Sequence, residues 1–159
     1  MKSRGLSYVS LLKDYANKKD LHKGISLHGD LVKHDLLRTN PCIANTLICM
    51  YAKCGDLPKA RNVFEEIRFR DFVTWNALIS GYIQHGQYDV ALNLFGMMPN
   101  QGLPPDVVTS ICTLKACSKT RDIGKGKQIH SKIMNSCSIE KDIALGNALV
   151  DMYAKCGVL

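Results

Sequence analysis

Long apolar runs are missing from this 159-residue chain, and so is a secretory-type N-terminus. No stretch of 18 or more residues is both mostly apolar and free of charge, whereas a membrane-spanning helix needs about 20 apolar residues. The opening segment MKSRGLSYVSLLKD contains no apolar run of secretory type before charged residues recur. These absences argue against a transmembrane protein and against a secreted one.

The residue patterns of common active sites are also missing. Glutamate is scarce, with three residues (Glu65, Glu66 and Glu140), and there is no His-x-Glu, no Gly-x-Ser-x-Gly and no Walker-type glycine loop. Such patterns supply the general bases, nucleophiles and phosphate-binding amides of many enzymes. The sequence therefore predicts no catalytic residues and no enzyme activity.

Cysteine is present without the spacing of a disulfide framework or a zinc site. The chain has seven cysteines, an odd number, and no Cys-x-x-Cys pair. We therefore expect reduced, buried thiols that act as small core residues, with no metal and no cofactor.

The composition that remains is that of a folded, basic protein. Hydrophobic residues make up 46% of the chain and charged residues 22%, as in ordinary globular domains. Lysine and arginine number 21 against 14 acidic residues, which gives a net charge of +7. This excess favours a polyanionic partner.

An internal repeat runs through the chain. The segment MYAKCG occurs at residues 50–55 and again at 152–157, an offset of 102 residues, and His28 matches His130 at the same offset. A shorter pattern, Asn-x-Leu-[Ile/Val]-x-x-Tyr, begins at Asn45, Asn76 and Asn147. Such self-similarity is the signature of a repeat architecture.

These marks divide the chain into four complete units and one incomplete unit. The complete units are 5–40, 41–71, 72–106 and 107–142, with lengths of 36, 31, 35 and 36 residues, and the incomplete unit is 143–159. Each complete unit is expected to form two helices, because its apolar residues recur at helical spacing.

The second and third units show this spacing most clearly. In the second, Gly55 is expected to end the first helix and Asp56 to cap the second. The expected apolar positions are Ile43, Leu47, Ile48, Met50, Tyr51, Ala60, Val63, Phe64 and Ile67 in the second unit, and Val73, Ala77, Leu78, Tyr82, Ala91, Leu92, Leu94 and Phe95 in the third.

Stacked helical hairpins of this kind predict an all-α fold, a right-handed α-α superhelix, or solenoid, of helix-turn-helix repeats. One hairpin cannot bury its apolar face alone, whereas stacking each hairpin on the next builds a continuous core. The incomplete unit contributes one helix, expected over 143–155, and no polar capping helix. We therefore expect this end to expose apolar surface and to fray.

With the units aligned, the chain resembles the pentatricopeptide repeat (PPR) family, and in particular the plant subclass that alternates long, short and standard motifs. The resemblance covers residues 5–159 and depends on the unit lengths, MYAKCG, LKAC and KGKQIH within 114–130, and VTWNALISGY at 73–82. The first unit departs from the pattern at residues 13–15, where Lys-Asp-Tyr replaces Lys-Ala-Cys. The alternative is a protein-binding solenoid of the tetratricopeptide type, whose Trp, Leu, Tyr, Ala and Phe spacing the third unit also satisfies.

What the resemblance implies is recognition of single-stranded RNA, one base per repeat, by the fifth and the last residue of each motif. These residues are Asn45 with Asp71 in the second unit and Asn76 with Asp106 in the third. The resemblance assigns this pairing to pyrimidines, with uracil preferred over cytosine. Asn147 is the fifth residue of the incomplete unit, and its partner position lies beyond Leu159.

The long units carry weak or non-coding pairs: Val9 with Asn40, and Ile111 with Asp142. An aliphatic fifth residue cannot form a hydrogen bond with a base edge. An alternative for all the junction residues is that they only cap the following helix. The second residue of each motif (Leu6, Cys42, Val73, Val108 and Ala144) would lie between neighbouring bases by the same resemblance, although burial between repeats explains most of them as well.

Lysine recurs at the thirteenth motif position, at Lys53, Lys119 and Lys155. A flexible point charge at each repeat suits phosphate contact, and a solvated helix end is the alternative.

The resemblance further implies a site-recognition factor in organellar RNA processing or C-to-U editing, in a mitochondrion or chloroplast. The chain lacks the His-x-Glu and Cys-x-x-Cys elements of a zinc cytidine deaminase, so any editing activity is expected to come from a missing portion or from a recruited partner. A deaminase or editing-factor protein acting in trans is therefore a candidate partner, and a membrane is not. The first motif begins at residue 5 and leaves no room for a transit peptide. We therefore expect either that upstream sequence is missing or that the product is not imported.

Overall fold

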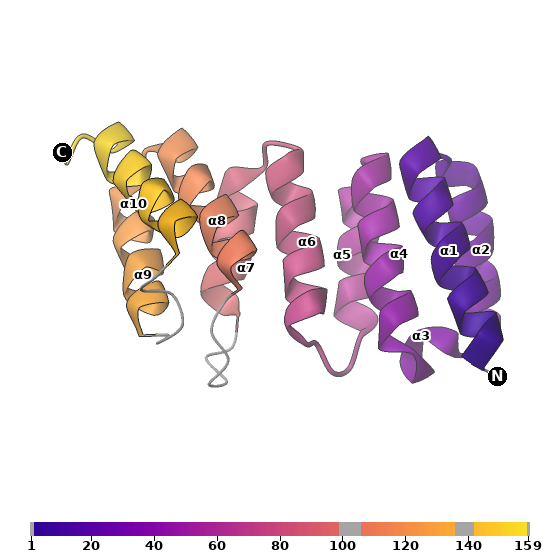
Figure 1. Cartoon of the computed structure of the whole chain (residues 1–159). Coiled ribbons are helices and arrows are strands. Elements are labelled where there is room, and N and C mark those ends of the chain that lie inside the picture. The colour runs from indigo at the N-terminus through magenta and orange to yellow at the C-terminus, as the bar shows by residue number, and fades with distance from the viewer. Residues whose placement is uncertain (1, 99–105, 136–141, 159) are drawn as a thin grey trace. The chain divides into compact units, whose positions relative to one another are not determined.

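In the computed structural model, residues 2–98, 106–135 and 142–158 are described, with side chains from residue 7 onward, and every regular element in these ranges is an α-helix. The chain divides into two compact units, Met1–Gly81 and Tyr82–Leu159. Figure 1 labels the helices of each unit. The absence of strands from the described residues confirms the all-α prediction.

The first compact unit pairs antiparallel helices. Its helices are α1 (Lys2–Lys18), α2 (Leu21–Lys33), α3 (Leu36–Thr39), α4 (Pro41–Cys54), α5 (Leu57–Glu66) and the part of α6 (Phe72–Gln84) that extends to Gly81. Helix α1 packs beside α4, and α2 and α5 each pack against α4. The short helix α3 was not expected from the sequence.

The second compact unit repeats the arrangement. It contains the end of α6 together with α7 (Tyr88–Met97), α8 (Val107–Thr120), α9 (Ile123–Met134) and α10 (Ile143–Lys155). Helix α8 packs against α7, α9 and α10. Stacked helical hairpins are therefore present in both units.

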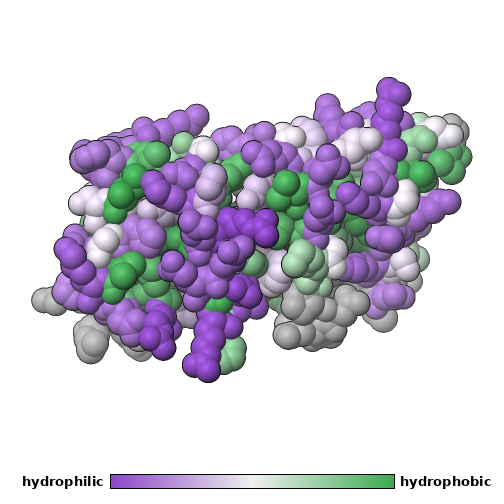
Figure 2. All heavy atoms as spheres, turned by 180° about the vertical axis from the view of Figure 1, so that it is seen from behind, coloured by the Kyte–Doolittle hydropathy of each residue, from purple (hydrophilic) through white to green (hydrophobic). Residues whose placement is uncertain are grey.

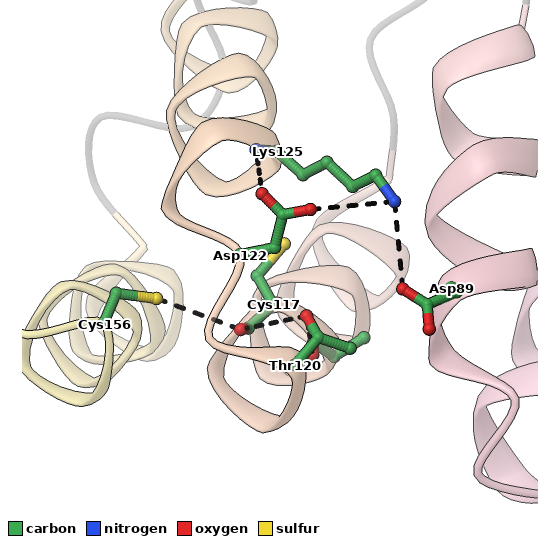
Figure 3. Close-up of polar contacts among 7 residues, drawn as sticks. Asp89, Cys117, Thr120, Asp122, Lys125 and Cys156 are labelled. Carbon is green, nitrogen blue, oxygen red and sulfur yellow. Dashed lines mark hydrogen bonds and ion pairs between the residues drawn. The ribbon is translucent and has the colours of Figure 1, made fainter.

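The helices begin and end where side-chain chemistry favours it. Asp56 caps α5 by accepting a hydrogen bond from the backbone N–H of Lys59 (3.1 Å), and Gly55, with φ of 88°, ends α4 in the left-handed conformation that glycine adopts without strain. Figure 3 shows the corresponding cap of α9, where Asp122 accepts from the N–H of Lys125 at 2.9 Å. The predicted caps at Gly55 and Asp56 are confirmed.

The core follows most of the predicted apolar positions. Ile43, Leu47, Ile48, Met50 and Tyr51 are all fully buried on α4, and the predicted residues of α7 are buried as well. Val73 is different, because 59% of its surface is exposed. The buried face of α6 contains Trp75 and Leu78, and a residue two positions before Trp75 points about 200° away around the helix. The prediction of a buried Val73 was therefore wrong.

One packing arrangement occurs in both compact units. His28 Nδ1 lies 2.8 Å from Tyr51 Oη, and His130 Nδ1 lies 2.8 Å from Tyr153 Oη. The rings meet edge to face in each pair. Burial raises the pKa of Tyr51 to about 12 and lowers the pKa of His28, so the first pair is a neutral hydrogen bond near pH 7. We call this His–Tyr contact the joint. It connects residues of a 36-residue sequence unit with residues of the sequence unit that follows it.

A close glycine–methionine contact accompanies each joint. A Cβ atom at Gly24 or at Gly126 would lie 2.5 Å from the Sδ atom of Met50 or Met152, respectively. The repeat of 102 residues in the sequence is therefore also a repeat of contacts.

The cysteines are less buried than expected. Among the described residues, Cys117 is buried, Cys42 is exposed, and the other four are half-buried: Cys49, Cys54, Cys112 and Cys156. All six are free thiols, and burial raises the pKa of Cys117 to about 12. The Cys156 thiol donates to the Cys117 carbonyl oxygen at 3.9 Å (Figure 3).

The surface combines polar and apolar areas. The face seen in Figure 2 is mainly hydrophilic, with separate apolar patches. Apolar side chains of α10 are exposed, including Ile143 at 80%. Over the described residues, no helix has the length and apolar character required to cross a membrane, and no three His, Cys, Asp or Glu side chains cluster as metal ligands.

Candidate nucleic-acid interface

The first two residues of the expected base-recognition set lie together in the first compact unit. Asn45 is in the second turn of α4, and Asp71 directly precedes α6. The Asn45 Nδ2 atom donates to Asp71 Oδ1 at a long distance of 3.5 Å. The stacking of α4 and α6 thus brings together two residues that are 26 positions apart.

Asp71 receives three hydrogen bonds on one oxygen. Besides Asn45, the backbone N–H of Thr74 donates to Asp71 Oδ1 at 2.9 Å, and the Thr74 hydroxyl donates to the same atom at 2.7 Å. Partial burial raises the pKa of the Asp71 carboxyl, but the hydrogen bonds from Thr74 and Asn45 outweigh it and leave the pKa below its usual value. The carboxylate is therefore charged near neutral pH and fixed in position.

The contact with Asp71 determines which way the Asn45 amide faces. A carboxylate can only accept hydrogen bonds, so the NH₂ group must point to it. Asn45 Oδ1 is then left buried and without a hydrogen-bond partner within the protein, on a side chain that is 8% exposed. An unsatisfied buried carbonyl is costly unless a ligand or water supplies a donor.

Space for a ligand exists next to this amide. Asn45 and Thr74 both line a cleft of about 610 Å³ in the first compact unit, together with residues of α3, α5 and the segment between α5 and α6. The residue that carries the unsatisfied acceptor therefore lines a cavity within the first compact unit.

The expected pair of the third sequence unit, Asn76 and Asp106, has one member in each compact unit. Asn76 is half-buried on α6 in the first unit, and Asp106 is exposed in the second. Asp106 caps α8 by accepting from the N–H of Thr109 at 2.8 Å.

The last residue of each sequence unit caps the helix that follows it, as the alternative interpretation of these residues predicts. Asn40 Oδ1 accepts from the N–H of Cys42 (3.1 Å) at the start of α4, and Asp142 Oδ1 accepts from Leu145 (3.0 Å) at the start of α10. Asp71 is a cap as well, but it also contacts the fifth residue, Asn45, of its unit. Capping and contact with the fifth residue therefore coexist at residue 71.

The other fifth residues differ in exposure. Val9 and Ile111 are half-buried, and Asn147 is exposed on α10. Neither aliphatic side chain carries a polar atom for a base edge.

The second residues of the motifs are open to solvent. Val108 is 67% exposed, Val73 is similarly open, and Cys42 and Ala144 are also exposed. Burial between repeats, the alternative explanation, is therefore wrong for these four residues, while the side chain of Leu6 lies outside the described residues. Exposed apolar side chains at this position are available to contact bases.

The three lysines at the thirteenth motif position are all exposed. Lys53 Nζ donates to Oδ1 of Asn17, the thirteenth residue of the first unit, at 3.5 Å, so equivalent positions of neighbouring repeats are adjacent. Lys155 pairs with Asp151 at 2.9 Å, and an exposed pair of this kind is weak enough to exchange for a phosphate.

Thr74 is a residue of this site that the sequence analysis missed. The available signal is the spacing Asp-x-x-Thr, which occurs at 71–74 and again at 106–109 and resembles a helix-capping box. Arg70 was also missed; its guanidinium donates to the carbonyl oxygens of Phe64 and Glu65 at 2.8 Å and so caps the end of α5.

Comparison with known proteins identifies relatives over the whole chain. Family models match residues 42–72 (PPR repeat) and 70–119 (PPR repeat family). The chain is 38% identical to the mitochondrial pentatricopeptide repeat-containing protein At3g09040 of Arabidopsis thaliana, over all of this chain and 16% of that protein. It is 35% identical to the chloroplastic protein At1g11290 of the same plant, over all of this chain and 19% of that protein. The chain thus spans about a fifth of the length of these relatives.

Solved structures share the fold. Pentatricopeptide repeat protein PPR10 from maize aligns with a TM-score of 0.73 and 19% identity, over 99% of this chain and 24% of that one. PPR10 in complex with an 18-nt psaJ RNA element aligns with a TM-score of 0.68 and 22% identity, over 96% of this chain and 22% of that one. Sequence, repeat contacts and solenoid fold agree, and the chain belongs to the pentatricopeptide repeat family.

Proposed function

We propose that this chain binds single-stranded RNA and reads bases through the fifth and last residues of its repeats. The observation that carries the proposal is the Asn45–Asp71 contact, which leaves Oδ1 unsatisfied on an asparagine that lines a cleft. Membership of the family and the maize PPR10–RNA complex support the same ligand class.

The chemistry of the oriented amide is compatible with a pyrimidine edge. Asn45 offers Oδ1 as an acceptor and the second hydrogen of Nδ2 as a donor. Uracil carries an N–H donor beside a carbonyl acceptor, and cytosine carries an amino donor beside a ring-nitrogen acceptor, so either base can form two hydrogen bonds with this amide. Adenine and guanine carry the same pairs of groups, so the preference for pyrimidines over purines, like that for uracil over cytosine, rests on the family resemblance.

The proposal extends to the third repeat, where Asn76 and Asp106 would read the adjacent base. It includes the repeat boundaries given above, 5–40, 41–71, 72–106, 107–142 and 143–159, and the plant subclass with long, short and standard motifs. The two long repeats, with Val9 and Ile111 at the fifth position, would contribute little specificity.

In its biological setting, the chain would act as a site-recognition segment for organellar RNA processing or C-to-U editing. Two of the relatives carry the words mitochondrial and chloroplastic in their names. These 159 residues show none of the zinc-deaminase elements, so we propose that catalysis comes either from a portion of the protein outside them or from another protein, such as a cytidine deaminase acting in trans.

The proposal is tested by measuring affinity for short RNAs that differ at two adjacent central bases. We expect U-U to bind more tightly than A-A or G-G, by about 1–3 kcal/mol for each recognised base. Fluorescence anisotropy at fixed salt is a suitable measurement. Equal affinity for all three RNAs, together with tight binding of a peptide, would contradict the proposal and favour a protein-binding solenoid of the tetratricopeptide type.

Phosphate contact by Lys53 makes a separate prediction. Lys53→Ala should weaken binding to all RNA sequences about equally and reduce the slope of log K against log salt by about 0.7, because one fewer counterion is released from single-stranded RNA. Lys33→Ala is the matched control, since Lys33 is an exposed lysine on the second helix of a hairpin. An unchanged slope in the Lys53 variant would remove this residue from the interface.

A further inference from the structure

The Thr74 side chain has a role that helix capping does not require. The cap of α6 is complete once the N–H of Thr74 donates to Asp71 Oδ1. The hydroxyl adds a second, shorter bond of 2.7 Å to the same atom. Thr74 is 2% exposed, so this polar group is held in the interior against the carboxylate.

The four repeat junctions show a correlation between this hydroxyl and the fifth residue. The residue three places after the junction is Thr74 after Asp71 and Thr109 after Asp106, and the repeats that end there carry asparagine at the fifth position (Asn45 and Asn76). After Asn40 and Asp142, this residue is Ile43 or Leu145, and the fifth residues are Val9 and Ile111. All four junctions have a side-chain cap, so capping alone does not explain where threonine occurs.

Physical chemistry connects the hydroxyl to the amide. The oxygen and the NH₂ group of an asparagine amide are almost identical in size and shape, so only the groups that contact the amide fix which of the two points in a given direction. At Asn45, the contact with Asp71 is long, at 3.5 Å, so it depends on the exact position of the carboxylate. A hydrogen bond from a single backbone N–H leaves the Asp71 carboxylate free to rotate about χ2, because the energy wells of this torsion are broad. A hydroxyl on a β-branched side chain, itself restricted at χ1, removes that freedom.

We propose that Thr74 is a positioning residue for base recognition by the second repeat: its hydroxyl holds Asp71 where the carboxylate orients the Asn45 amide. The inference rests on the proposed RNA-binding function and adds a third residue to the pair that reads the base. Thr74 contacts Asp71 and acts on the base only through Asn45.

The first test measures discrimination between bases. Thr74→Val keeps the shape of the side chain and removes the hydroxyl, and it should reduce the preference for U over A at the second repeat by about three- to tenfold, the range of one hydrogen bond. Thr74→Ser restores the hydroxyl and should keep the preference within about twofold. Thr46→Val is the control, because the Thr46 hydroxyl donates to the Cys42 carbonyl in the same helix as Asn45; it should leave the preference unchanged.

The second test needs no RNA. Because the Thr74 hydroxyl lowers the pKa of the Asp71 carboxyl, that pKa, measured by carbon NMR, should rise in Thr74→Val and not in Thr74→Ser or Thr46→Val. A Thr74→Val variant that keeps both the base preference and the Asp71 pKa of the wild-type chain would overturn the inference. If the wild-type chain itself shows no base preference while the pKa of Asp71 shifts as expected, the proposed function fails and the positioning of the carboxylate stands.

Discussion

Asn45→Ala should abolish the preference for a pyrimidine at the second repeat. The variant loses both the acceptor Oδ1 and the donor Nδ2, so affinity for RNA with U at that position should fall by about 1–3 kcal/mol, or roughly 5- to 150-fold. Affinity for RNA with a purine there should change much less. Competition binding with RNAs that differ at this one base measures both effects.

Val9→Ala is the matched control for Asn45→Ala. Val9 is the fifth residue of the first repeat and lies in the same compact unit, but it carries no polar atom. This variant should keep the wild-type preference at every base. Equal losses in the two variants, with circular dichroism unchanged, would show that position five does not read bases in this chain.

Gly81→Ala should destabilise the first compact unit. A Cβ atom at Gly81 would lie 2.6 Å from the Cβ of Ala52 on α4. Ala52 is buried and cannot rotate away, so α4 and α6 must move apart. Because neither Cβ atom can move aside, we expect overpacking to cost toward the upper end of about 1–3 kcal/mol in the free energy of unfolding, which leaves a net loss after the gain of about 1 kcal/mol from replacing glycine in a helix.

The same substitution at Gly29 has the opposite expected sign. A Cβ atom there has nothing within 4 Å, so Gly29→Ala should stabilise the chain by about 0.5–1 kcal/mol through helix propensity alone. Urea denaturation followed by circular dichroism compares the two variants. If Gly81→Ala is as stable as Gly29→Ala, the close approach of α4 to α6 is incorrect.

The helices and most of the core could be predicted from the sequence because apolar spacing encodes them directly. Residues such as Leu47 and Phe95 occur at helical period, and each is buried. Val73 was misplaced because an apolar side chain in the first turn of a helix satisfies the periodic pattern about as well as a core residue does. Helix α3, with four residues, is too short for any period to be visible.

The Asn45–Asp71 pair could be found only through the family pattern, since 26 residues separate its members. The contribution of Thr74 could not be found in this way, because hydroxyls three residues after an aspartate are ordinary in helix caps. Its significance depends on where the third donor, Asn45, lies in space. Sequence spacing predicts single helices well. A network of three residues on two helices can be identified only when the packing of those helices is known.

The joint formed by His28 and Tyr51 has its counterpart in His130 and Tyr153, with the same distance of 2.8 Å in both compact units. The two joints therefore consist of the same pair of side chains at the same separation, and they lie 102 residues apart in the sequence. We expect that inserting or deleting a segment of 102 residues preserves this pairing, because each side chain then meets the equivalent residue of the other copy. For protein engineering, a 102-residue segment is therefore the unit of exchange that we expect to keep both contacts.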